Sequence, residues 1–344
     1  MQLTARALDR TLLLRQHLLE RTDVEPLAMV EHLVGLQAQE PLPPYLSLAA
    51  RVAGFDPLAL SAHLERREAV RLLTMRGTIH LLAPADALAL RPWVQPFLDR
   101  QLRSDRQARP AAHLAREELA AAANAHVPVP AAELRERFTA AFPETSADAT
   151  LQAARSRLPL VQAPPRGLWQ RAGGVSYVDV EHWLGAPQTE IDLPTLVRRW
   201  LRAYGPATAS DLTTWSGVTR LGPVLADLVL TRHTGPDGAV LLDVPDAPIA
   251  EEDTAAPARL LGRYDNLWLS HTKRDRVLAG EDRKRWMGTN GGVGQLVLLD
   301  GAGAGFWRLE KGRVVLDLWR EPTRSEREEL AEEVERVERL LAVR

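Results

Sequence analysis

The segment LPTLVRRWLRAYGPATASDLTTWSGVTRLGPVLADLVLTRHTGPDGAVLLDV, residues 193–244, decides the fold. Its pattern predicts a helix from Pro194, a turn at Gly205-Pro206, a short helix over 209–217 and another near 222–230. Two strands follow, on either side of the turn sequence Gly-Pro-Asp-Gly at 235–238. Two helices joined by a tight turn and closed by a hairpin are typical of a winged helix-turn-helix unit.

Two earlier segments show a comparable order. Residues 26–85 predict a helix from Pro26 to about Gln37, a proline-rich exit, a helix over 57–67 and a hairpin divided at Arg76-Gly77. From residue 127 onward, helices are predicted over 130–138 and 147–158, followed by two strands around a turn at 164–167. We therefore predict an α+β protein, mainly α, with three tandem winged helix-turn-helix units whose concave surface can hold a DNA duplex.

The last ninety residues have a different sequence pattern. Short apolar runs at 296–299 and 314–316 are separated by glycines, which predicts a small β-barrel or sheet. A charged terminal helix begins with a possible capping box at Thr323 or Ser325. We expect four domains. Residues 1–125 hold the N-terminal helices and the first winged unit, 126–190 the second unit, 191–254 the third unit, and 255–344 a β-rich barrel with the terminal helix.

Composition excludes several classes of protein. The chain has 344 residues, 45% of them hydrophobic, a net charge of -2 and no cysteine. These values indicate a globular protein of two to three domains without disulfides, thiolate metal sites or a cysteine nucleophile. The N-terminus has no signal-peptide pattern and no long apolar window occurs, so we expect a cytoplasmic protein without membrane spans.

The basic residues have a pronounced bias, because all but three of the 43 are arginine. Arginine suits bidentate phosphate contact, although a GC-rich genome produces the same bias. By position along the chain, the candidates for phosphate contact are Arg15, Arg71, Arg76, Arg198, Arg199, Arg202, Arg220 and Arg232.

Familiar catalytic and metal motifs are missing from the sequence. The nine histidines never occur at i, i+3 or i, i+4 spacing, so no helical metal motif exists and we predict no metal and no cofactor. Neither a G-x-S-x-G nucleophile elbow nor a Walker loop is present. The run GTNGGVG at 288–294 resembles a phosphate loop only weakly, and we interpret it as a turn.

One polar pair stands out, the Gln37-Ala38-Gln39 segment. Gln37 continues the apolar stripe of Leu27, Val30 and Val34, so its amide is expected to point inward and to need partners. Pro41 ends the predicted helix nearby, and the two amides can then converge. Two interpretations stay open: a functional amide pair, or amides that cap loose carbonyls at a helix end.

Four segments carry a resemblance to a known family: MVEHLVGLQAQEPLPPYLSLAARV (29–52), TMRGTIHLLAPADA (74–87), YGPATASDLTTWSG (204–217) and LLGRYDNLWLSHTKR (260–274). Together they resemble the AlkZ/YcaQ family of winged-helix DNA glycosylases. The glutamines at 37 and 39 match the catalytic Gln-x-Gln motif of its AlkZ branch. The resemblance implies three winged helices forming a C-shaped DNA cleft, a C-terminal β-barrel, and excision of bulky adducts or interstrand crosslinks left by natural-product alkylating agents.

The residue types agree with that chemistry. An N7- or N3-alkylated purine is already cationic and leaves without a general acid, so neutral amides that orient one water suffice. We therefore expect a monomeric, monofunctional glycosylase acting on damaged double-stranded DNA and associated with the nucleoid. Gln37 and Gln39 are the expected catalytic residues, and the expected DNA contacts are Arg76, Thr78, His80, Arg220 and Arg274.

Two other functions remain compatible with the same layout. A winged-helix transcription regulator would use the C-terminal barrel for an effector, and it is the main alternative. A scaffold that binds only proteins is the other, since winged helices also recur in protein contacts.

Overall fold

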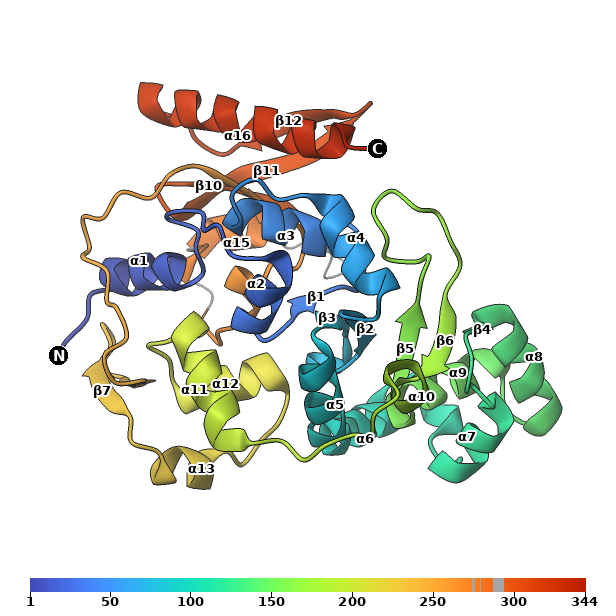
Figure 1. Ribbon diagram of the computed structural model, residues 1–344. Coiled ribbons are helices and arrows are strands. Elements are labelled where there is room, and N and C mark those ends of the chain that lie inside the picture. Colours follow the sequence, from blue (N-terminus) through green and yellow to red (C-terminus); the bar gives the residue numbers. More distant parts are fainter. Residues whose placement is uncertain (274–275, 279, 287–293) are drawn as a thin grey trace.

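The computed structural model describes residues 1–273, 276–278, 280–286 and 294–344 (Figure 1). Arg274 and most of the 288–294 run lie outside these residues, so the structure says nothing of either prediction. None of the helices in these ranges is long and apolar enough to cross a bilayer.

The first part of the chain alternates short helices with a hairpin. Pro26, Pro43, Pro57 and Pro84 each stand at the start of a helix, where the fixed φ of proline is favourable. The elements are α1 Ala5–Arg15, α2 Pro26–His32, β1 Leu36–Gln37, α3 Pro43–Arg51, α4 Pro57–Glu65, β2 Val70–Leu73, the 3₁₀ turn η1 Met75–Gly77, β3 Ile79–Leu82, α5 Pro84–Trp93 and α6 Gln95–Ser104.

The second part joins the first through a shared antiparallel sheet with strand order β1-β3-β2-β5-β6-β4. Leu72 of β2 pairs with Val161 of β5, so the two predicted hairpins lie edge to edge. Helices α7 to α9 gather at the far end of this sheet (Figure 1). The elements are η2 Arg109–Ala111, α7 Arg116–Ala123, β4 Val129–Pro130, α8 Ala131–Ala141, α9 Ala147–Arg157, β5 Leu160–Ala163, β6 Ser176–Asp179 and α10 Val180–Leu184.

The third part has the element order predicted from its sequence. Asp192 accepts a hydrogen bond from the first turn of its helix, Thr208 forms a capping box with Asp211, and Gly217 ends the next helix at φ 81°. The elements are α11 Leu193–Tyr204, α12 Ala209–Ser216, α13 Gly222–Asp227, β7 Thr231–Thr234 and β8 Val240–Asp243.

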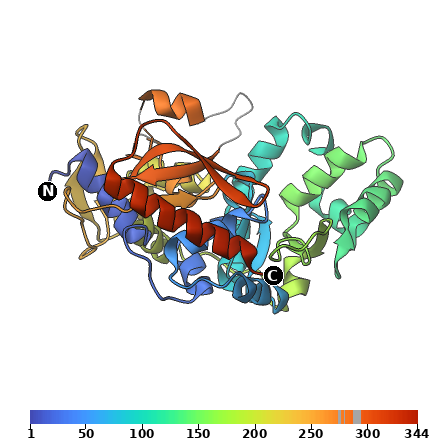
Figure 2. The same cartoon turned by 90° about the horizontal axis from the view of Figure 1, so that it is seen from above.

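The C-terminal part contains an open sheet where a barrel was one expectation. Its strand order is β12-β11-β10-β9, and the two edge strands do not pair with each other in the described residues. Helix α16 covers the sheet (Figure 2) and begins at the predicted Thr323 capping box. The elements are β9 Arg259–Leu261, α14 Asn266–Leu269, α15 Gly280–Trp286, β10 Gln295–Leu299, β11 Ala302–Glu310, β12 Arg313–Leu318 and α16 Arg324–Ala342.

A buried ion pair ties the first part of the chain to the C-terminal part. The Arg51 guanidinium, fully buried at the end of α3, donates to both carboxylate oxygens of Asp265 at 2.7 and 2.8 Å. It also donates to Gln16 Oε1 at 2.9 Å. Asp265 caps α14, so one guanidinium fixes α3 against the segment that follows β9.

Replacing Arg51 therefore tests how strongly these parts depend on each other. Arg51→Ala leaves a buried carboxylate without its counter-charge, which typically costs about 3–5 kcal/mol of unfolding free energy. Arg66→Ala, which breaks an exposed 2.8 Å pair with Glu68, is the matched control, and its expected cost is much smaller because solvent screens an exposed pair. Urea denaturation measures the unfolding free energy of both variants. Equal losses of stability would contradict the structural role of the Arg51–Asp265 pair.

Candidate active site

The polypeptide changes direction just before the two glutamines. Helix α2 ends at His32, and the backbone then takes positive φ values at Val34 (50°) and Gly35 (94°). At this positive φ, a Cβ on Gly35 would lie 2.4 Å from Leu82 Cδ2 and 3.2 Å from the Leu81 carbonyl oxygen, so glycine suits this close approach to β3. The prediction of a helix reaching Gln37 was therefore wrong: Gln37 lies on strand β1.

Strand pairing brings the glutamines to the hairpin. Gln37 stands opposite His80 in the β1–β3 register, and the Ala38 N–H donates to the Ile79 carbonyl at 2.7 Å. Gln37 is 7% exposed, whereas Gln39 is exposed. The two predicted site elements, the Gln-x-Gln segment and the hairpin, thus form one cluster.

Hydrogen bonds determine which way both amides face. Gln37 Oε1 accepts from Arg76 Nη2 at 3.3 Å, and Gln39 Oε1 accepts from the backbone N–H of Ile79 at 3.2 Å. Both partners are donors, so only the carbonyl oxygen of each amide can face them. Neither NH₂ group donates to another described residue, so neither amide caps a carbonyl in the part of the chain that the structure describes.

Arg76 lies at the centre of this cluster. It is half-buried, and its guanidinium donates to the Trp215 carbonyl at 2.6 Å and to His80 Nε2 at 3.1 Å, besides Gln37. His80 Nδ1 donates to the Thr78 carbonyl at 3.0 Å, so its Nε2 is the acceptor. Burial and the charge of Arg76 hold the pKa of His80 well below its usual range, and the ring is neutral.

A second arginine holds the residue between the glutamines. Arg71, 2% exposed on β2, donates to the Ala38 carbonyl at 2.6 Å and to the Arg166 carbonyl at 3.1 Å. Burial lowers its pKa to about 10, which leaves the guanidinium charged at neutral pH. This role was missed, because no local pattern reveals which carbonyl a distant arginine will bind.

The other residues predicted to contact DNA, Thr78, His80 and Arg220, differ in how far they are buried. Thr78 is half-buried and its hydroxyl donates to the Met75 carbonyl at 3.3 Å, while His80 is 1% exposed behind Arg76. Arg220 is exposed between α12 and α13, with a left-handed backbone at φ 65°. It makes no ion pair with any described residue, so its prediction as a phosphate contact stays a prediction.

Two arginines proposed for phosphate contact are instead structural. Arg15 is buried and donates to both carboxylate oxygens of Asp243 at 2.7 Å, and Arg71 is committed to two carbonyls as above. Arg199 is partly occupied as well, since it binds the Asp86 carboxylate at 2.6 and 2.8 Å. A position in the sequence does not distinguish a surface arginine from a buried one.

The loop after β9 forms another side of the site, which was not predicted. Arg263 and Tyr264, in the loop after β9, line a narrow crevice together with Gln37 and Ser47. Arg263 lies 3.4 Å from the Glu40 carboxylate in an exposed ion pair. The only sequence signal was that both residues fall in one of the four resembling segments.

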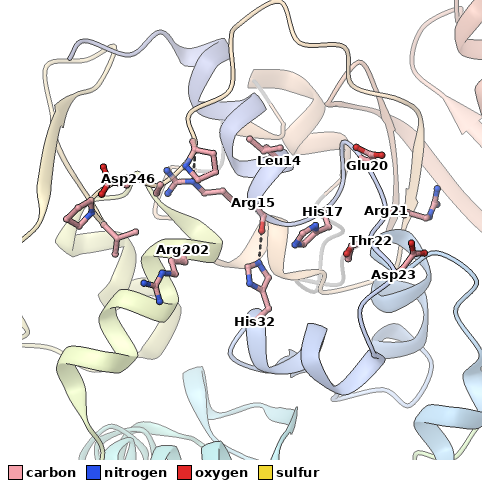
Figure 3. A pocket seen from close by; sticks show the side chains of 14 residues that line it. Leu14, Arg15, His17, Glu20, Arg21, Thr22, Asp23, His32, Arg202 and Asp246 are labelled. Carbon is pink, nitrogen blue, oxygen red and sulfur yellow. Dashed lines mark hydrogen bonds between the residues drawn. The ribbon is translucent and has the colours of Figure 1, made fainter.

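A larger cavity, of about 740 Å³, lies elsewhere, between α1, α2, α11 and the loop at 244–248 (Figure 3). His32 Nε2 donates there to the Arg15 carbonyl at 2.7 Å, and its ring meets His17 edge to face at 5.2 Å. Its lining mixes acidic and basic side chains and includes neither glutamine. In the residues described, no group of three or more possible ligands is placed to hold a metal ion.

Comparisons with known proteins agree on one family. AlkZ-like DNA glycosylases match residues 30–340. The chain is 26% identical over 328 residues to a Streptomyces sahachiroi protein named interstrand DNA cross-link repair glycosylase, with 88% of this chain and 87% of that protein covered. The structure of Streptomyces sahachiroi DNA glycosylase AlkZ superposes with a TM-score of 0.83 at 24% identity, covering 100% of this chain and 98% of that one. This chain belongs to the AlkZ-like family of DNA glycosylases.

Proposed function

We propose that this chain hydrolyses the N-glycosidic bond of cationic N7- or N3-alkylpurines in double-stranded DNA, with Gln37 and Gln39 as the catalytic residues. The observation that carries the proposal is the amide pair itself. Both oxygens accept from protein donors, and neither NH₂ group donates to another described residue.

The chemistry needs little from the protein because the leaving base carries a positive charge. As the bond to C1′ stretches, the sugar becomes oxocarbenium-like and a water must be held on its far face. Each amide oxygen keeps a second lone pair and each NH₂ group can donate, so the pair can orient one water through both kinds of contact. Neutral amides are too weakly basic to act on an unactivated nucleotide.

We further propose that the three helix–hairpin regions are winged helices lining a C-shaped cleft, with the domain limits 1–125, 126–190, 191–254 and 255–344. Support comes from the element order of the third region and from the fold shared with AlkZ. An open cleft suits bulky adducts and interstrand crosslinks, whose bases cannot be flipped freely. The name of the Streptomyces relative, which refers to cross-link repair, supports this extension.

We expect a monofunctional enzyme that leaves an abasic site. A lyase reaction needs an amine nucleophile, but none of the three lysines, Lys273, Lys284 and Lys311, lies near the Gln-x-Gln segment in the sequence. A transcription regulator is not favoured, because the family is one of glycosylases. The expected setting is the cytoplasm, associated with the nucleoid.

Substituting either glutamine should abolish most of the activity. We expect Gln37→Ala and Gln39→Ala to slow release of N7-methylguanine from duplex DNA by about 100-fold or more, since each loses a contact to the attacking water. Alkali cleavage of the resulting abasic sites measures the rate. Gln107→Ala, at an exposed loop glutamine, is the matched control. Normal excision by both site variants would refute the catalytic assignment.

The pH dependence of excision distinguishes water positioning from acid–base catalysis. His80 stays neutral because its pKa is lowered, and amides do not titrate, so the single-turnover rate should be flat from about pH 6 to 8.5. Uracil and unmodified purines should remain bound to the DNA. A bell-shaped profile near neutrality, or release of uracil, would mean that an ionisable group performs the catalysis.

DNA binding should depend on charge rather than on sequence. We expect a monomer that binds unrelated duplexes with similar affinity, and a logarithmic plot of affinity against salt with a slope of roughly -0.9 per phosphate contact. Sedimentation and fluorescence anisotropy at several salt concentrations measure both properties. A dimer that binds tightly to one palindrome would instead indicate a regulator.

A further inference from the structure

Arg76 occupies a backbone conformation that few arginines adopt. Its φ is 54° and ψ 12°, inside the tight turn η1 between β2 and β3. Gly77 follows at φ 68°, where an added Cβ would lie 1.9 Å from Gln101 Oε1. Left-handed conformations outside glycine persist where the surroundings enforce them, and they concentrate at functional sites. From this turn the Arg76 side chain reaches Gln37 of β1 and His80 of β3.

The contacts of Arg76 join two separate elements to one catalytic amide. Nη1 donates to the Trp215 carbonyl of α12 at 2.6 Å, which anchors the guanidinium plane. Nη2 then reaches Gln37 Oε1 at 3.3 Å and His80 Nε2 at 3.1 Å. The planar fork of a guanidinium holds several acceptors in fixed directions, which a lysine ammonium does not.

The contact with Gln37 has a directional consequence. An amide free to rotate presents its oxygen or its NH₂ group to a water with comparable ease. A donor on Oε1 fixes the oxygen toward Arg76 and turns the NH₂ group away from it. The Gln39 amide obtains the same restraint from the Ile79 backbone N–H, so its orientation does not depend on another side chain.

We propose that Arg76 is a positioning residue that acts through Gln37 by fixing the orientation of its carboxamide, and that it is not a phosphate contact. This inference rests on the proposed glycosylase function. His80 completes the arrangement, since its Nδ1–H is bound to the Thr78 carbonyl and its Nε2 accepts from Arg76.

A double-mutant cycle tests the proposal. Arg76→Ala should slow single-turnover excision of N7-methylguanine at least tenfold, and Gln37→Ala combined with Arg76→Ala should be no slower than Gln37→Ala alone by more than about twofold. Arg76→Lys should give an intermediate rate, because one ammonium cannot bind both Trp215 and Gln37. The Arg76→Lys variant also tests the proposal if Arg76→Ala fails to fold. Multiplicative losses in the double variant would overturn the proposal.

DNA affinity separates positioning from phosphate contact. Arg76→Ala should change the affinity for duplex DNA less than threefold and leave its salt dependence unchanged, as should Arg308→Ala at an exposed position on β11. If Arg76 instead binds a phosphate, affinity falls and the salt slope decreases by about one.

A readout without turnover keeps the two proposals distinguishable. The side-chain NH₂ resonances of Gln37, assigned by their loss in Gln37→Ala, should shift in Arg76→Lys far more than those of Gln39. If the wild-type chain does not release N7-methylguanine from DNA but the Gln37 resonances still shift in Arg76→Lys, the positioning role of Arg76 is supported and the proposed function is refuted. Unshifted Gln37 resonances in an active enzyme would overturn positioning alone.

Discussion

The hydrogen bond from Arg71 to the Ala38 carbonyl is the contact on which the site depends. At 2.6 Å it holds the residue between the two glutamines, so it sets the position of both at once. The second bond of the same guanidinium goes to the Arg166 carbonyl, in the loop between β5 and β6. A buried charge bound only to carbonyls is costly to desolvate, so other interactions of the neighbouring segments must offset that cost.

That loop is itself secured from two directions. The Tyr45 hydroxyl donates to the Gly167 carbonyl at 2.7 Å, and the Trp169 indole donates to the Val343 carbonyl near the C-terminus at 3.0 Å. A Cβ on Gly167 would lie 2.7 Å from the Arg71 side chain, so glycine permits this approach. The geometry at Ala38 therefore depends on the first, second and last parts of the chain together.

Local signals predicted much of this fold. Pro194, the turn at 205–206 and Gly217 placed the third helix pair, and Arg76-Gly77 marked the hairpin. The same kind of signal failed at Gln37, because an apolar stripe continues across a helix end that only the contact between Gly35 and Leu82 reveals. The expected barrel and the role of Arg71 depend on long-range pairing, which periodicity does not encode.

The charges around the glutamines bear on how the proposed selectivity for a cationic base would arise. Two guanidinium groups, Arg71 and Arg76, flank the neutral amides, and each would repel a positively charged base. These two side chains therefore do not attract such a base. In the proposed reaction, the positive charge of the base acts within the nucleotide, where it weakens the bond to be broken. On the proposed mechanism a pair of neutral amides is then sufficient, because a cationic lesion itself provides the activation that would otherwise require a general acid.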